Sequence, residues 1–137
     1  MKIRNELIKI IKGLSYKLIP KENLSNAYVG TIILDDLPVD LTITGDTISR
    51  GLCAITKFEI PAGVRICPIG FFCNQAFQYV KTSYYNPGDK EIEIRIHHLI
   101  TLKDKTIDES IVRLCIQYFE SVVIAINAFI KENVDNL

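Results

Sequence analysis

Apolar residues recur with helical spacing near the start of the chain, over residues 3–18. At about 100° per residue they fall on one side of a helix, and the lysines at 9, 12 and 17 fall outside it. Pro20 ends the pattern, because a proline disfavours helical backbone in the residue before it. The spacing predicts an amphipathic helix whose buried side is Ile3, Leu7, Ile10, Ile11, Leu14 and Leu18.

The next forty residues change to the two-residue period of strands. Residues 27–34 are rich in β-branched and aromatic side chains, and Asp35–Asp36 with Pro38 marks a turn. Over residues 39–44 apolar and polar side chains alternate, which predicts one buried and one solvated face in an antiparallel sheet. A third strand is predicted over residues 47–60, with a bulge at Gly51. Its inward set is Leu52, Ala54, Thr56, Phe58 and Ile60.

A second helix and a hairpin are predicted in the middle of the chain. Residues 64–78 show helical spacing, and Pro68 fits the first helical turn. Two strand-like segments, 79–85 and 90–101, flank a turn at 86–89. Ile92, Ile94 and Ile96 alternate with charged residues in the second arm, so that arm has one buried face.

The last helix is predicted from a capping box at residues 106–109, with Thr106 as the N-cap, to about residue 133. It carries two adjoining apolar stripes that cover roughly 200° of its circumference, twice what a surface helix needs. The first stripe is Ile107, Ile111, Leu114, Cys115, Tyr118, Val122, Ala125, Ile126 and Phe129; the second is Val112, Ile116, Phe119, Val123 and Ile130.

One stripe can pack on the sheet, and the other needs its own partner. That partner is either the first helix of the same chain or a second molecule, since large apolar patches usually mark interfaces. The interface candidates in the last helix are therefore Val112, Ile116, Phe119, Val123 and Ile130. Phe71 falls outside the apolar stripe of the middle helix, so it is a further interface candidate, with a core role as the alternative.

Length and charge narrow the class of protein. The 137 residues (15.5 kDa) fit one α+β domain spanning 1–137, and 16 basic against 16 acidic residues argue against nucleic-acid binding. The longest charge-free run, 66–80, is too short and too polar for a membrane span. No leader is visible, and the four cysteines form no CxxC pair, so we expect a cytoplasmic protein with reduced thiols.

The sequence contains few candidate residues for catalysis or for metal and phosphate binding. His97 and His98 adjoin in a predicted strand, so they point to opposite faces and cannot readily chelate one metal. The glycines form no phosphate-binding loop. Asp35, Asp36, Asp104, Asp108 and Glu109 are accounted for by turns and helix starts. A Cys73–His97 pair stays open as a weak catalytic candidate. We predict no catalytic residue, cofactor or metal.

The order helix, three strands, helix, two strands, helix resembles the type III secretion chaperone-like fold, and more specifically the YbjN-type family of bacterial proteins. The matching pieces are Pro61 after the third strand, the middle helix with Asn74, the hairpin 86–95 and the long apolar last helix. The resemblance implies a dimerising, non-enzymatic protein that binds other proteins. Secretion chaperones are typically acidic, so the neutral charge favours a shared fold over a secretion role.

These observations predict a two-layer α+β sandwich, α-β-β-β-α-β-β-α, with a mostly antiparallel five-stranded sheet. The favoured function is a cytosolic chaperone-like or protein-interaction module, a homodimer or a client binder, that uses an apolar helix face. One alternative is a regulatory domain with an apolar small-molecule pocket between sheet and helices. The other is an enzyme with a Cys–His or carboxylate site.

Overall fold

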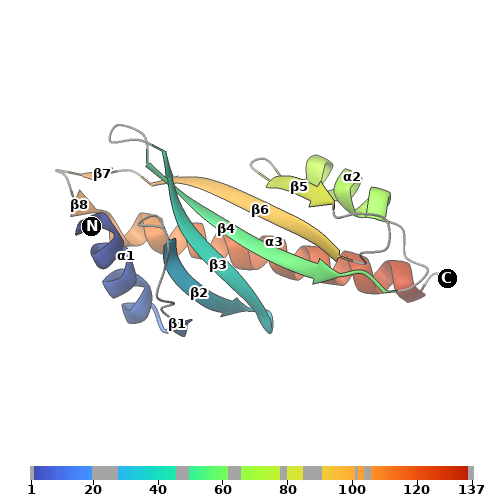
Figure 1. The fold of residues 1–137 in the computed structure, drawn as a ribbon, viewed down its shortest axis with the longest axis horizontal. Coiled ribbons are helices and arrows are strands. Elements are labelled where there is room, and N and C mark those ends of the chain that lie inside the picture. Colours follow the sequence, from blue (N-terminus) through green and yellow to red (C-terminus); the bar gives the residue numbers. More distant parts are fainter. Residues whose placement is uncertain are drawn as a thin grey trace.

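The computed structural model describes residues 2–19, 28–45, 50–61, 66–77, 80–84, 91–100, 102–103 and 106–135. Within these residues, three helices and eight strands follow one another (Figure 1). They are α1 (Lys2–Gly13), β1 (Leu18–Ile19), β2 (Tyr28–Leu34), β3 (Leu37–Gly45), β4 (Arg50–Glu59), α2 (Ile66–Ala76), β5 (Val80–Tyr84), β6 (Glu91–Ile100), β7 (Leu102–Lys103), β8 (Thr106–Ile107) and α3 (Glu109–Asp135).

The main sheet has the order β1-β2-β3-β4-β6-β5, and each neighbouring pair is antiparallel. The five predicted strands are therefore present, and the two-residue β1 extends the sheet at one edge. β7 and β8 form a separate short pair. α3 runs across one face of the sheet, with α1 near its first turns and α2 near its C-terminal half (Figure 1). The predicted α+β order is confirmed.

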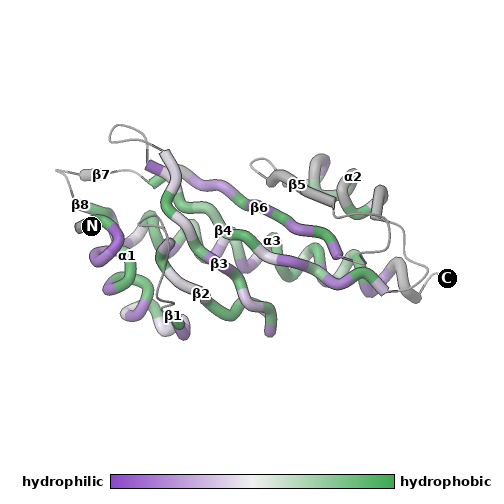
Figure 2. The backbone as a smooth tube through the Cα atoms, viewed as in Figure 1, coloured by the Kyte–Doolittle hydropathy of each residue, from purple (hydrophilic) through white to green (hydrophobic). Residues whose placement is uncertain are grey.

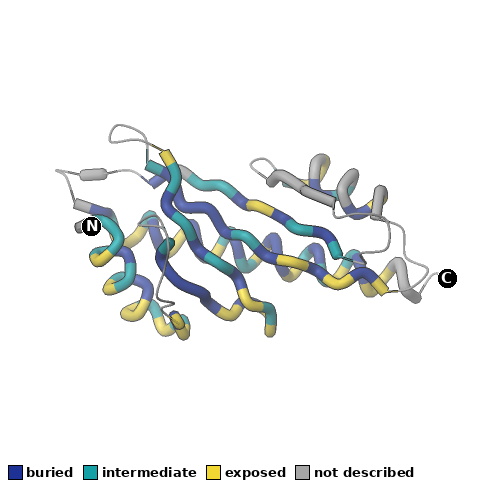
Figure 3. Tube along the Cα trace, viewed as in Figure 1, coloured by how far each residue is buried: buried dark blue, intermediate teal, exposed yellow. Residues whose placement is uncertain are grey.

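The core lies between the sheet and α3, where hydrophobic segments face each other (Figures 2 and 3). The predicted alternation is confirmed in β3, where Val39, Leu41 and Ile43 are buried. It is also confirmed in β6, and in β4 for the whole inward set from Leu52 to Ile60. Opposite residues of β3, β4 and β6 lie in one unbroken register, so their other side chains share a second, open face.

α1 is one turn shorter than the sequence predicted. It ends at Gly13, where the Leu14 N–H donates to the Ile11 carbonyl at 3.1 Å and tightens the last turn. Ser15 then takes a left-handed backbone (φ 69°), which no helix continues. Leu18 is buried as predicted, but it is buried from β1, opposite Ile32.

The predicted bulge at Gly51 is wrong. The β4 register runs through Gly51 without interruption, and the bulge lies in β2, between Tyr28 and Gly30. Space favours glycine at position 51, because a Cβ there would stand 2.7 Å from Thr44 Oγ1, which would have to move, and 3.3 Å from the His98 carbonyl oxygen. At Gly30 the backbone also has a positive φ of 155°, which favours glycine. A Cβ at this position would lie only 2.8 Å from Leu18 Cδ1.

The β2–β3 turn places two aspartates in left-handed backbone, with φ 49° at Asp35 and 63° at Asp36. Two positive φ values in a two-residue hairpin loop are the type I′ geometry, which glycine adopts more easily than other residues. Asp36→Gly should therefore raise the free energy of unfolding by about 0.5–1 kcal/mol. Urea unfolding tests this, with Glu59→Gly as the control that should destabilise, because Glu59 sits in the extended β4. An unchanged or lower midpoint for Asp36→Gly would contradict the prediction.

The N-cap of α3 is Asp108, not Thr106 as the sequence predicted. Thr106 belongs to β8, paired with Lys103, and the helix begins at Glu109. The Asp108 carbonyl accepts from the N–H groups of Ile111 and Val112 at 3.1 and 3.2 Å. Its Oδ1 accepts from the Ser110 N–H at 2.9 Å and from the Ser110 hydroxyl at 2.6 Å.

Asp108→Ala should consequently cost about 1 kcal/mol of unfolding free energy, since it removes the side-chain acceptor at the helix start. Asp108→Asn keeps an acceptor oxygen and should retain most of that stability. Thermal and urea unfolding of the two variants give the comparison. Equal losses in both would mean that the side chain does not act as a cap.

Candidate functional site

The five predicted interface residues of α3 are buried inside the monomer. Val112, Ile116, Phe119 and Val123 have no exposed surface, and Ile130 has 6%. The sequence left open whether the chain itself or a second molecule covers this stripe, and the structure shows that the chain covers it. The sheet itself covers the stripe: α3 contacts β4 and β6 as well as α1, so one face of the helix receives side chains from several strands.

The remaining apolar surface of α3 lies on its other side. Leu114 is 59% exposed and Ile124 is 48% exposed, although both are large aliphatic side chains. They belong to a strip of exposed or half-buried residues without any charge, which we call the uncharged face. Its members are Ser110, Leu114, Gln117, Tyr118, Ser121, Ile124, Ala125 and Ala128.

The charged residues of α3 lie outside this strip. Between Ser110 and Ala128 they are only Arg113 and Glu120, and at about 100° per residue both fall to one side of it. Arg113 lies 4.0 Å from Glu109, one turn back on that side. The uncharged face is therefore continuous over five helical turns.

α2 extends the uncharged surface beside the C-terminal half of α3. Phe72 stacks on Phe129 with ring centroids 4.3 Å apart and planes 4° apart, and it meets Phe77 edge-on at 5.8 Å. A shallow hollow of about 370 Å³ lies there, lined by Pro68, Phe72, Gln75, Ala76 and Phe129. Phe71, the remaining interface candidate, lies in α2, but its side chain is outside what the structure describes.

By length and composition alone, residues 109–132 of α3 could also span a membrane. The core helix of a soluble domain passes the same test, and 39% of the apolar 18-residue window within this stretch is buried inside the molecule. The buried residues are those that pack beneath the sheet. Its hydrophobicity is therefore explained first by the core and then by the uncharged face.

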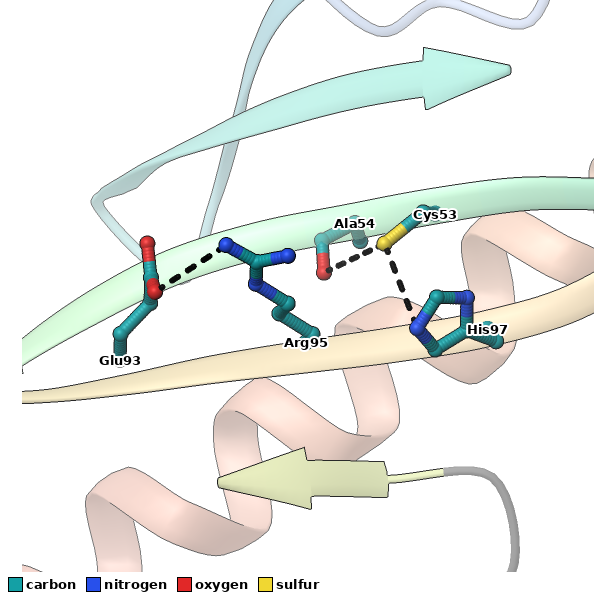
Figure 4. Close-up of polar contacts among 5 residues, drawn as sticks. All are labelled: Cys53, Ala54, Glu93, Arg95 and His97. Carbon is teal, nitrogen blue, oxygen red and sulfur yellow. Dashed lines mark hydrogen bonds and ion pairs between the residues drawn. The ribbon is translucent and has the colours of Figure 1, made fainter. Parts of the chain in front are cut away.

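A cysteine and a histidine meet on the open face of the sheet, but they are not the pair that the sequence suggested. Cys53 of β4 and His97 of β6 are register partners, and Sγ lies 3.8 Å from Nε2 (Figure 4). Cys73 is instead buried in α2. Burial raises the pKa of the Cys53 thiol more than its hydrogen bond to Thr42 and the charge of Arg95 lower it. Cys53 is therefore a protonated thiol at neutral pH, not an activated nucleophile.

The two histidines point to opposite faces, as predicted. His97 lies beside Cys53 on the open face, near the Glu93–Arg95 ion pair, whose atoms are 3.6 Å apart (Figure 4). The His98 ring approaches the Tyr118 ring of α3 at 6.0 Å on the covered face. Among the described residues, no three His, Cys, Asp or Glu side chains converge in a way that could hold a metal ion.

Three of the carboxylates suggested by the sequence, Asp35, Asp108 and Glu109, have polar partners. Asp35 Oδ2 accepts from the Asn127 amide at 2.9 Å and so ties the β2–β3 turn to α3. Asp108 caps α3. Asp40, which the sequence analysis did not single out, accepts from Tyr28 Oη at 2.8 Å and Thr31 Oγ1 at 2.7 Å. Asp104 lies outside the described residues. Asp35, Asp40 and Asp108 thus act in a turn, within the sheet and at a helix start.

No family model matches the sequence, and no curated protein matches it. A solved structure does: the crystal structure of YbjN from E. coli, described as a candidate transcription regulator. The likeness covers 91% of this chain and 91% of that chain, with a TM-score of 0.53 and 12% sequence identity. At this identity it shows the fold alone. The chain has a YbjN-type fold, which confirms the resemblance expected from the order of its elements.

Proposed function

We propose that the protein is a non-enzymatic protein-binding module, and that it contacts its partner through the uncharged face of α3 and the adjoining hollow of α2. The observation that carries the proposal is the exposure of Leu114, at 59%, in the middle of a strip that contains no charge. A YbjN-type fold is consistent with a regulator or an interaction module.

The composition of the strip favours a protein partner. What distinguishes the centre of a protein interface from other surface is the depletion of charged side chains, and aromatic residues are enriched there. The uncharged face meets both criteria, because Tyr118 lies in it and Phe72 and Phe129 adjoin it. Covering a large aliphatic side chain such as Leu114 contributes about 1.5–3 kcal/mol. The free energy of binding is therefore most favourable for a partner that covers Leu114.

The polar chemistry of the described residues supports a binding role over the two alternatives. Cys53, which faces His97, is kept protonated by burial, and Asp35 and Asp108 act in a turn and a helix cap. The space between sheet and helices is filled by the core side chains, whereas the hollow of α2 opens at the surface. A zero net charge also favours protein over nucleic acid as the partner of a regulator.

Site-specific photo-cross-linking in cells tests the proposal. A benzophenone amino acid in place of Leu114 should give a covalent adduct with a protein, either a second copy or another chain. The same amino acid at Lys57, an exposed residue of β4 on the open face of the sheet, is the matched control and should give none. Adducts from position 57 alone would indicate that the partner binds the open face of the sheet. Adducts from neither position would contradict the proposal.

A further inference from the structure

We propose that Cys53 and His97 form a binding site for monovalent copper, Cu(I), on the open face of the sheet. This activity is separate from the proposed function, because α3 covers the opposite face. No metal was predicted from the sequence, since the register that brings the two residues together cannot be read from it. The proposal follows from the position of the two donor atoms, their chemical type, their number and their burial.

Two internal strands of the sheet hold the donor atoms opposite each other. Cys53 and His97 are partners in the β4–β6 ladder, which runs without a break from Arg50 to Glu59 of β4. Side chains in such pairs start about 4.5–5.5 Å apart at Cβ, so both can reach one ion without a change of backbone. Sγ and Nε2 point toward each other and are 3.8 Å apart (Figure 4). The donor pair is therefore preorganised by the sheet.

The distance between the two donor atoms fits a metal ion. Metal–ligand bonds of the kind that zinc makes are about 2.3 Å to a thiolate and about 2.0–2.1 Å to an imidazole. With these lengths, the observed 3.8 Å between Sγ and Nε2 corresponds to an angle of about 120° at the ion. This is the angle of trigonal coordination, which leaves one further position for a water molecule. The ion replaces the thiol proton, which leaves to solvent, and nothing is oxidised or reduced.

The type and number of the donors favour Cu(I). A thiolate selects Cu(I), zinc or iron–sulfur clusters, and imidazole suits copper and zinc, so the two donors together leave copper and zinc. Zinc sites use three or four protein ligands. Among the residues that the structure describes, no third His, Cys, Asp or Glu joins Cys53 and His97. Cu(I) is stable at low coordination numbers, and the pair is sufficient for it.

Burial of the sulfur favours a monovalent ion. Cys53 is only 2% exposed, and a net charge is costly at such a position. Cu(I) bound to a thiolate has no net charge, as the thiol has none. A divalent ion would leave a positive charge there, near Arg95, which precedes His97 on the same face of β6 (Figure 4). The Glu93 carboxylate is already paired with Arg95, at 3.6 Å, so it does not offset a further positive charge.

Anaerobic titration with Cu(I) tests the site. Every protein carries Cys67→Ser, because the side chain of Cys67 lies outside the described residues and adds a competing thiol. The protein is added to the bicinchoninate complex of Cu(I), whose absorbance falls as the ion is withdrawn. Each chain should withdraw a single ion. His97→Gln should weaken binding by roughly tenfold or more, and Cys53→Ser should abolish it. Cys73→Ala, which removes a buried thiol from α2, is the matched control and should change nothing.

X-ray absorption at the copper edge is the second measurement, and it does not depend on the stability of a variant at position 53 or 97. One sulfur and one imidazole nitrogen around the ion would support the site. Two sulfurs, or an equal loss of binding in Cys73→Ala, would overturn it in favour of adventitious binding by thiols. Tighter binding of Zn(II) than of Cu(I) would overturn the choice of ion. No withdrawal of Cu(I) would overturn the metal site, and photo-adducts from position 114 would still support the proposed function.

Discussion

Phe119→Ala is expected to lower the free energy of unfolding by about 3–5 kcal/mol, enough to unfold a large fraction of a domain of this size. Phe119 has no exposed surface and is among the largest fully buried side chains of the core. Truncation removes its transfer free energy and leaves a cavity under the sheet that the surrounding strands can fill only in part. Urea unfolding followed by circular dichroism measures the loss.

Leu114→Ala is the matched control, in the same helix and less than two turns away. It should change the unfolding free energy by no more than about 0.5 kcal/mol, as surface substitutions usually do. Its effect should appear in binding of the proposed protein partner instead. If Phe119→Ala weakened partner binding at unchanged stability, the buried stripe would be an interface after all. The two variants thus separate the core from the uncharged face.

The order of the elements could be read from the sequence because each element carries its own local signal. The alternation in residues 39–44 and 92–96 fixed which side of β3 and β6 is buried, and the inward set of β4 was correct from Leu52 to Ile60. Such patterns depend only on side-chain direction along a strand. The helix ends were less certain, because a cap depends on a single hydrogen bond: Asp108 and Thr106 are both good caps in isolation.

The interface residues could not be placed, because the choice between two apolar stripes depends on tertiary contacts. The helical wheel shows that α3 has more apolar surface than one contact needs, but the wheel does not show its rotation against the sheet. The structure rotates α3 so that the second stripe is buried together with Cys115, Val122 and Ile126. Leu114, assigned to the sheet by its stripe, is consequently on the surface. The absence of charge along the uncharged face, from Ser110 to Ala128 on one side of the helix, was the signal that could have identified the exposed side.

The Cys53–His97 contact could not be predicted from the sequence either, because it depends on the register between β4 and β6. These strands are separated by α2 and β5 along the chain, and a shift of one residue would exchange the faces of all their side chains. Cys73 and Cys115, in contrast, were correctly expected to behave as small apolar residues. Their burial has a consequence for stability at high pH.

Stability is expected to fall steeply as the pH rises above about 9. Burial raises the pKa of the Cys73 and Cys115 thiols from the ordinary value of 9.0 to about 11. Between these two values the unfolded chain releases the thiol protons and the folded chain keeps them. The unfolded state therefore binds fewer protons, and the free energy of unfolding decreases with pH by about 1.4 kcal/mol per unit for each thiol. Below pH 9 both states are protonated and this contribution is constant.

Urea unfolding at pH 7.5, 9.5 and 10.5 measures the slope, and the Cys73→Ala, Cys115→Ala double variant isolates the thiols. Tyr16 and Tyr28 have raised pKa values, chiefly because of burial, and add to the alkaline slope in every variant, so the comparison is between slopes and not between absolute stabilities. The double variant should start less stable at pH 7.5, because two buried side chains are shortened, and then lose less stability per pH unit. Identical slopes would mean that the thiols ionise as easily in the folded protein as in the unfolded chain, in conflict with their burial under the sheet.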